Sequence, residues 1–105
     1  MTSRMEAIRN QRAARRGRDL DRAWALVTED LRNSGIDLRR FGSSSRGEAR
    51  AHSDLDIMVL GCPDAGQRLR VERAVARASR ETGVPCDLHF ARDYTAEDLE
   101  AILDV

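Results

Sequence analysis

The chain has 105 residues, of which 41% are apolar, 34% charged and 4% aromatic. This length allows one small domain with a modest core. The net charge is zero, which argues against a globally basic nucleic-acid-binding protein or an acidic tail protein. The charge is uneven, however, because residues 1–40 hold ten arginines against six acids and residues 41–105 hold eight against twelve.

Two cysteines, Cys62 and Cys86, provide neither a disulfide framework nor a four-ligand zinc site. We therefore expect free, buried thiols in a reducing compartment. The first residues contain no apolar run, which argues against a secretory signal. No apolar stretch, Ile57–Leu60 included, is long enough to cross a membrane. Together these features predict a soluble cytoplasmic protein with no membrane partner.

The first third of the chain is expected to be helical. Residues 4–34 fit one long helix, or two helices with a break near Gly17. One apolar face recurs at helical spacing and predicts core packing, with Leu20, Trp24, Val27 and Leu31 as its members. The first half of this segment holds Met5 and Ile8 among a cluster of arginines. A solvated helix, a surface that docks a partner or a second copy, and an RNA-binding arm remain open interpretations, although no aromatic residue is interleaved to stack bases.

Strand and loop signals follow this helix. Residues 36–41 alternate imperfectly and fit a short strand. Residues 42–53 are small and polar and contain two glycines, which predicts a loop with a short helical turn. Residues 55–60 are apolar enough for a buried strand, and the chain turns at residues 61–64.

A second helix is expected from Asp64 to about Thr82. Asp64 is a good N-cap, and Gln67 three residues later fits a capping box. Gly83 suits the position after the last turn, and Pro85 prevents continuation. The inner face of this helix is formed by small or branched side chains at Val71, Ala74, Val75 and Ala78.

The remaining residues fit a strand and a last helix. Residues 86–91 place Asp87 and His89 on one strand face. Thr95 can cap a final helix whose buried stripe is Leu99, Ile102 and Leu103. Strands separated by helical segments predict a layered α/β or α+β domain. We expect one domain over residues 1–105, with a helical segment at 1–35 and a core at 36–105.

The residues that carry chemistry lie in the loop after the first strand. Gly42 and Ser43 open a helical turn, whose backbone N–H groups attract anions. Glycine lets a phosphate approach the backbone, and the Ser43 hydroxyl can donate to a phosphate oxygen. Gly47 allows a tight exit from the turn. Arg46 is compatible with a phosphate contact and equally with a solvated arginine.

Three aspartates complete the candidate site. Asp54 and Asp56 are two residues apart on a strand, so their side chains share one face. Two like charges favour a cation, and carboxylate oxygens suit magnesium. Asp87 joins them if its strand lies beside that of Asp56. Three carboxylates, a phosphate-binding turn and one or two magnesium ions are the parts that nucleotidyl transfer needs, and Asp87 can accept the proton of the attacking hydroxyl.

This pattern resembles a known family. Gly42-Ser43, ten residues and then Asp54-x-Asp56 resemble the G-S-x(10)-D-x-D signature of minimal nucleotidyltransferases, within the DNA polymerase beta-like superfamily. Asp87 arrives 31 residues after Asp56, a spacing typical of the third aspartate in that family. The resemblance covers about residues 36–91. It departs from the pattern at Ser44, where many relatives have arginine. The other matching positions are Phe41, Arg46, Gly47 and Ser53.

The resemblance implies an α+β fold, a small mixed sheet with helices packed mainly on one side, here preceded by a long N-terminal helix. It implies that Ser43 contacts the terminal phosphates of a nucleoside triphosphate such as ATP. It also implies that Asp54 and Asp56 bind magnesium and that Asp87 completes the catalytic metal site. The rest of the nucleotide-binding set is Gly42, Arg46, Gly47 and Ser53.

The implied reaction moves a nucleoside monophosphate, most simply AMP from ATP, onto an acceptor hydroxyl and releases pyrophosphate. Many small members resemble antitoxins encoded beside a HEPN-domain ribonuclease toxin, and some transfer AMP to a tyrosine of that toxin. We therefore expect an antitoxin that modifies a protein hydroxyl. Two alternatives stay open. One is a catalytically weak module that neutralises a toxin by binding, and the other is an enzyme acting on RNA or a small-molecule hydroxyl.

Overall fold

The computed structural model describes residues 3–103, apart from the side chain of Ser44. The outermost positions of the predicted domain, residues 1–2 and 104–105, lie outside the described residues. The elements follow in the order α1 (Arg4–Asp30), β1 (Leu38–Phe41), the 3-10 turn η1 (Ser43–Arg46), β2 (Leu55–Val59), α2 (Ala65–Thr82), β3 (Cys86–Phe90), the 3-10 turn η2 (Ala91–Asp93) and α3 (Ala96–Leu103).

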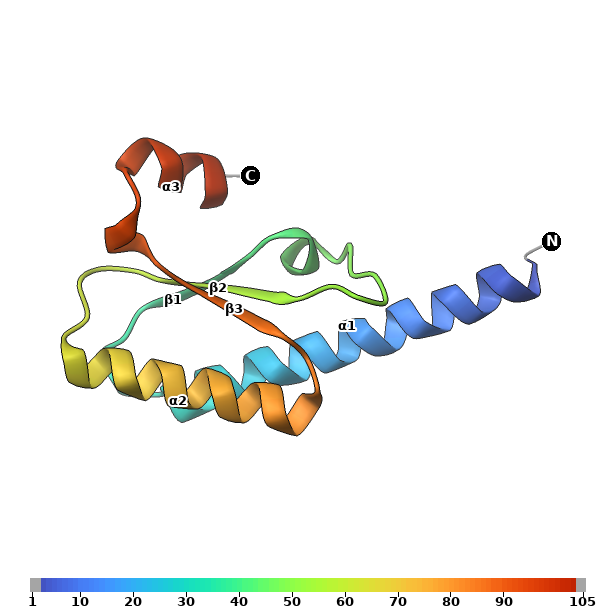
Figure 1. Ribbon diagram of the computed structural model, residues 1–105, viewed down its shortest axis with the longest axis horizontal. Helices are drawn as coiled ribbons and strands as arrows, with labels where there is room; N and C mark the ends of the chain where they lie inside the picture. Colours follow the sequence, from blue (N-terminus) through green and yellow to red (C-terminus); the bar gives the residue numbers. More distant parts are fainter. Residues whose placement is uncertain (1–2, 104–105) are drawn as a thin grey trace.

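The three strands form one mixed sheet with β2 in the centre. β1 runs antiparallel to β2, and β3 runs parallel to it. A parallel pair needs a crossover connection, which α2 supplies. Figure 1 shows α1 and α2 side by side on one face of the sheet, with η1 and α3 beyond the other face. The expected α+β fold, with a mixed sheet and helices mainly on one side, is confirmed.

The core lies between the sheet and the two long helices. The β2 side chains that face the helices, Leu55, Ile57 and Val59, are fully buried. Each such side chain contributes roughly 1.5–3 kcal/mol relative to an exposed position. The predicted faces of both long helices enter this core, with Trp24 packed against its edge. The buried residues of the two helices, with the C-cap Leu31 of α1, are Leu20, Ala23, Val27, Leu31, Val71, Ala74, Val75 and Ala78.

The helix ends explain most of the boundaries. α1 continues through Gly17 without a break, and it ends at Asp30, four residues earlier than expected. Asn33 and Gly35 then both adopt left-handed backbone conformations, which these residue types tolerate best. α2 begins with the predicted capping box and ends at Gly83 in the left-handed conformation.

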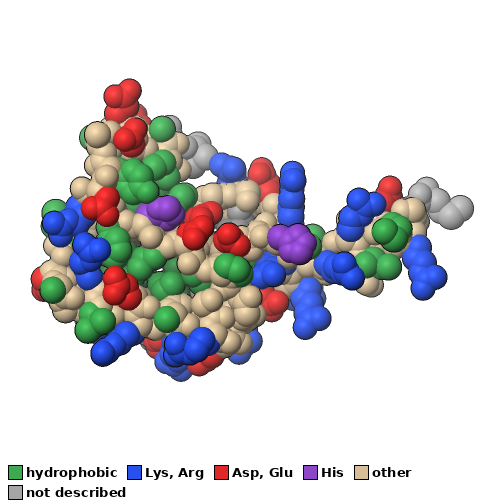
Figure 2. Space-filling model, viewed as in Figure 1, with side chains coloured by type: hydrophobic (Ala, Val, Ile, Leu, Met, Phe, Trp, Pro, Cys, Tyr) green, Lys and Arg blue, Asp and Glu red, His purple; other side chains and the backbone are tan. Residues whose placement is uncertain are grey.

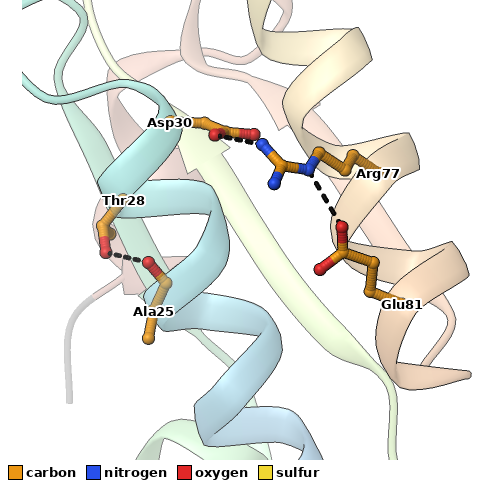
Figure 3. Close-up of polar contacts among 5 residues, drawn as sticks. All are labelled: Ala25, Thr28, Asp30, Arg77 and Glu81. Atoms are coloured by element: carbon orange, nitrogen blue, oxygen red, sulfur yellow. Dashed lines mark hydrogen bonds and ion pairs between the residues drawn. The ribbon is translucent and has the colours of Figure 1, made fainter.

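An ion-pair bridge joins the two long helices at their outer surface. Arg77 on α2 donates to Asp30 on α1 at 2.8 Å and to Glu81, one turn further along α2, at 3.0 Å. Figure 3 shows the guanidinium between the two carboxylates. The side chain of Arg77 is half exposed, so this bridge orients the helices more than it stabilises the fold.

The prediction for α3 is wrong in one respect. Its expected buried stripe is only half buried, and no residue of the described part of α3 is fully buried. The reason is that α3 lies over the sheet face opposite α1 and α2, away from the main core (Figure 1). The half-buried residues are Leu99, Ile102 and Leu103.

Both cysteines are free thiols, as expected, but the predicted burial is wrong, because Cys62 is exposed and Cys86 is only half buried. Burial raises the pKa of the Cys86 thiol, and the negative charges of Asp54 and Asp87 raise it further. Within residues 3–103, no helix combines the length and the apolar character that crossing a membrane would require.

Candidate active site

The strand register brings the predicted aspartates together. Asp56 on β2 and Asp87 on β3 are partners in the parallel ladder, so their side chains stand side by side on one face. Because Leu55 and Ile57 point into the core, that face is the one away from the long helices. Asp54 directly precedes β2 and belongs to the same face by alternation. In Figure 2, acidic side chains gather beside a histidine near the middle of the view.

The electrostatics of this group favour a cation. Partial burial raises the pKa of the Asp56 carboxyl, and the charges of Asp87 and Asp54 raise it further, whereas His89 lowers it. The unfavourable charged form of Asp56 is the expected result of crowding like charges on adjacent strands. A bound cation would relieve this repulsion.

The donor set fits magnesium in its chemistry. All three candidate ligands offer carboxylate oxygens, and Asp54 and Asp87 are exposed, which leaves room for the water ligands that magnesium retains. Within residues 3–103, no three acidic, histidine or cysteine side chains lie close enough together in this structure to hold a metal ion. Metal binding at Asp54, Asp56 and Asp87 therefore requires side-chain rotation and stays a prediction.

Gly42 lies directly against Asp56. It follows Phe41, the ladder partner of Asp56, and has a φ of 84°. A Cβ atom at this position would overlap Oδ2 of Asp56 and would lie 3.2 Å from its Cγ. The sequence suggested that glycine makes room for a phosphate. In the structure, the space beside Gly42 is occupied by the Asp56 carboxylate.

The turn after Gly42 has the expected form. The backbone N–H and the hydroxyl of Ser45 both donate to the Gly42 carbonyl, at 3.1 and 2.7 Å. Ser43 is exposed at the start of η1. Gly47 adopts a φ of 75°, as a tight exit requires. Arg46 forms a long ion pair of 3.8 Å with Glu48, so its predicted phosphate contact stays a prediction.

The loop that leads into Asp54 is tied to α1. Ser53 and Arg50 close it by a reciprocal pair of hydrogen bonds, in which Ser53 Oγ accepts from the Arg50 N–H at 2.7 Å. Arg16 Nε donates to the Ala51 carbonyl at 3.0 Å. Sequence reasoning placed Arg16 only within a basic cluster, because no local pattern reports a contact between residues 35 positions apart.

A second group that sequence reasoning missed surrounds His89. Alternation correctly placed His89 on the face of Asp87, and in the register it stands opposite Met58, two residues beyond Asp56. Its Nδ1 atom shares a hydrogen bond of 2.8 Å with the Tyr94 hydroxyl. Its ring also meets Phe41 edge-on, with 5.3 Å between the ring centroids. His89 is therefore fixed beside the carboxylates by contacts from β1 and from the segment after η2.

The fold and these contacts agree with a comparison to protein families. The family model described as "Nucleotidyltransferase domain" matches residues 22–102. The chain belongs to this nucleotidyltransferase family. The matched range contains the whole sheet, the Gly42-Ser43 turn and all three aspartates, and it begins inside α1. A search of curated proteins finds no match to the chain.

Membership in the nucleotidyltransferase family assigns nucleotidyl transfer as the class of reaction and a nucleoside triphosphate as the class of substrate. The nucleotidyltransferase also carries a hollow of about 630 Å³ elsewhere, along the outer face of α2, that includes Arg70, Arg73 and Arg77. The assignment of the chemistry to the carboxylates stays a prediction. It is favoured over this hollow because nucleotidyl transfer needs acidic groups, whereas the hollow is lined mainly by arginines and small apolar residues.

Proposed function

We propose that the protein transfers AMP from ATP to a hydroxyl group of a partner protein, and that it acts as the antitoxin of a HEPN-type ribonuclease toxin. The observation that carries this proposal is the ladder pairing of Asp56 with Asp87, with Gly42 packed against Asp56. This juxtaposition supports the proposal because it brings the Gly42-Ser43 turn and acidic groups from two strands within one small surface. Membership in the nucleotidyltransferase family supports the reaction class.

In the proposed reaction, each element has a separate task. The Gly42-Ser43 turn receives the terminal phosphates of ATP through its backbone N–H groups and the exposed Ser43 hydroxyl. Asp54, Asp56 and Asp87 hold magnesium, which when bound neutralises phosphate charge and lowers the pKa of the attacking hydroxyl. The remaining nucleotide contacts are assigned to Arg46, Gly47 and Ser53.

The bond changes follow from this placement. Asp87 accepts the proton of the acceptor hydroxyl. The acceptor oxygen forms a bond to the α-phosphorus of ATP, and the bond between that phosphorus and the bridging oxygen to the β-phosphate breaks. Pyrophosphate leaves with the electron pair of that bond. The residues of the chain bind, orient and deprotonate, and they form no covalent intermediate.

The openness of the site supports a macromolecular acceptor. Ser43, Asp54 and Asp87 are all exposed. A small-molecule acceptor is usually enclosed by its binding pocket. A side chain presented on the surface of a partner protein needs no such enclosure, because the partner itself covers the site.

The test is a transfer assay with ATP labelled at the α-phosphate, in the presence of magnesium. The acceptors are the product of the adjacent gene and total RNA, tested separately. The double variant Asp54→Asn, Asp56→Asn removes two carboxylates, and Asp37→Asn, an exposed aspartate before β1, is the matched control. Label on the protein that is lost only in the double variant supports the proposal. Label on RNA would contradict the protein acceptor.

A second candidate function is neutralisation of the toxin by binding alone. It is favoured by the observation that, in the described part of the chain, the acidic side chains are not gathered closely enough to hold a metal. The two functions differ in one result. If the Asp54→Asn, Asp56→Asn variant still neutralises the toxin as well as the wild type, binding rather than transfer is the function.

A further inference from the structure

The N-terminal half of α1 extends away from the rest of the molecule. In Figure 1 this end of the helix projects beyond the sheet and α2. The helix has 27 residues and is therefore about 40 Å long, yet its first buried residue is Leu20. We call residues 4–15 the arm. No residue of the arm is fully buried, Met5 is 66% exposed, and the family match begins only at residue 22.

The arm gains little stability from the rest of the chain. A helical stretch of about 12 residues is marginal in water on its own. Here it is continued from the packed half of α1 and closed by a capping box between Ser3 and Glu6. Of residues 4–12, only Ile8 is half buried and the others are exposed. Arg12 and Arg15 line a small cavity together with Thr82 and Gly83 at the end of α2, and Ala13 lines another with Gly47 and Ala49. The arm therefore presents a preformed helical surface to solvent.

The surface of the arm is positively charged and includes a small apolar area. The arm holds four arginines against the single acid Glu6, whereas the rest of the chain holds fourteen arginines against seventeen acids. A groove of about 430 Å³ runs along one face. Ile8 and Ala14 contribute apolar surface to it and arginines contribute charge. The groove residues are Ile8, Gln11, Arg12, Ala14, Arg15 and Arg18.

These features select among the occupants of the groove. A second copy of the arm is disfavoured, because two net-positive helices repel each other. Single-stranded nucleic acid is disfavoured, because no aromatic side chain is present in the arm to stack bases. An acidic amphipathic helix fits both the apolar surface and the positive charge of the groove. Its apolar side chains would meet Ile8, and its carboxylates would pair with Arg12 and Arg15.

The base of the arm lies next to the candidate site. Arg16 holds the Ala51 carbonyl, and Gly17 is packed close to Ala49. This loop continues directly into Asp54. A partner bound along the arm is therefore held at the edge of the carboxylate face.

We infer that the arm docks an acidic amphipathic helix of the acceptor protein and presents the acceptor hydroxyl to the site. This inference rests on the proposed function for the identity of the partner. The docking chemistry itself depends only on the arm, so that the two can be tested separately.

The experiment measures binding of a fluorescent helical peptide of about 20 residues, built from glutamate, alanine and leucine, by anisotropy. A uridine oligonucleotide of similar length is the second probe. The variant Arg12→Glu, Arg15→Glu reverses the groove charges. The matched control Arg70→Glu, Arg73→Glu reverses two exposed arginines at the same spacing on α2. A further variant, Ile8→Asn, keeps every charge and removes this apolar side chain.

The inference predicts that the peptide binds the wild type and weakens with added salt. Binding falls about tenfold or more in the arm variant, which is about 1.4 kcal/mol, and less than about twofold in the α2 control. Ile8→Asn also weakens peptide binding. Circular dichroism of each variant verifies that α1 is retained, and Arg12→Gln, Arg15→Gln replaces the charge reversal if it is not.

Four results would overturn the inference: no peptide binding, equal loss in the arm and α2 variants, binding of the oligonucleotide but not the peptide at the arm, or an arm-dependent dimer in sedimentation. Binding of Mg·ATP is measured on the same proteins. A wild type that binds Mg·ATP but not the peptide removes the docking inference alone, whereas a wild type that binds the peptide but no ATP removes the proposed function alone.

Discussion

Replacing Gly42 with alanine tests the close approach between the Gly42-Ser43 turn and Asp56. The perturbation has two parts. The φ of 84° is a left-handed conformation that costs an alanine about 1–2 kcal/mol. The new Cβ atom also overlaps Oδ2 of Asp56 and lies 3.2 Å from Cγ, so the carboxylate has to rotate. Moving a half-buried side chain off its rotamer adds about 0.5–1.5 kcal/mol. The expected total is roughly 2–3 kcal/mol of lost stability.

Gly61→Ala is the matched control, because Gly61 has a φ of 75° and nothing within 4 Å of its added Cβ atom. Gly61→Ala carries the energetic cost of an alanine in a left-handed backbone conformation, but it displaces no neighbouring side chain. Urea unfolding gives the stability of both variants, and the AMP-transfer assay gives their activity. We expect Gly42→Ala to be about 1 kcal/mol less stable than Gly61→Ala and to lose most of its activity, while Gly61→Ala keeps wild-type activity. Equal stability and equal activity in the two variants would refute the argument.

The remaining predictions concern three contacts around the site. The pKa of Asp56 is raised in the folded state, so the folded protein binds the carboxyl proton more tightly than the unfolded chain does. The stability of the metal-free protein therefore falls as the pH rises from the ordinary pKa of 3.8 through the raised pKa. Asp56→Asn should remove this fall and stabilise the metal-free protein at neutral pH by about 0.2–1 kcal/mol, and an unchanged pH slope in chelator-treated urea titrations would contradict this. Arg16→Gln should lower kcat/KM measured well below the melting temperature, because it releases the Ala51 carbonyl in the loop before Asp54. A lower melting temperature with unchanged kcat/KM would count against this role. Tyr94→Phe should shift the His89 ring resonances in NMR spectra and cost about 0.5–1.5 kcal/mol, and unchanged resonances would rule out the hydrogen bond.

Local chemistry predicted most of the fold. The capping box of Asp64 and Gln67 fixed the start of α2, and the apolar spacing of Val71 and Ala78 identified its buried face. Alternation in β3 correctly separated Asp87 from the core-facing residues. These signals work because they depend on neighbours within one turn or one strand, where backbone geometry alone sets the contacts.

Tertiary contacts account for what the sequence did not predict. The stripe of α3 has the right spacing for burial, but spacing does not say which sheet face the helix reaches or how much surface is there to cover it. The sequence placed Asp87 beside Asp56 only if their strands were neighbours. The structure shows that β2 and β3 pair in parallel, with Asp56 opposite Asp87. The hydrogen bond between Arg16 and Ala51 joins distant segments and left no periodic pattern.

The central claim is that Asp56 and Asp87 act as parts of one catalytic site. The most direct measurement is magnesium-dependent transfer of α-labelled AMP by the wild type, Asp56→Asn, Asp87→Asn and the double variant. Residues that act as a unit are strongly non-additive. We predict that each single substitution lowers kcat at least about 100-fold and that the double variant is little worse than either. Full activity in Asp87→Asn, or losses that multiply in the double variant, would contradict this claim.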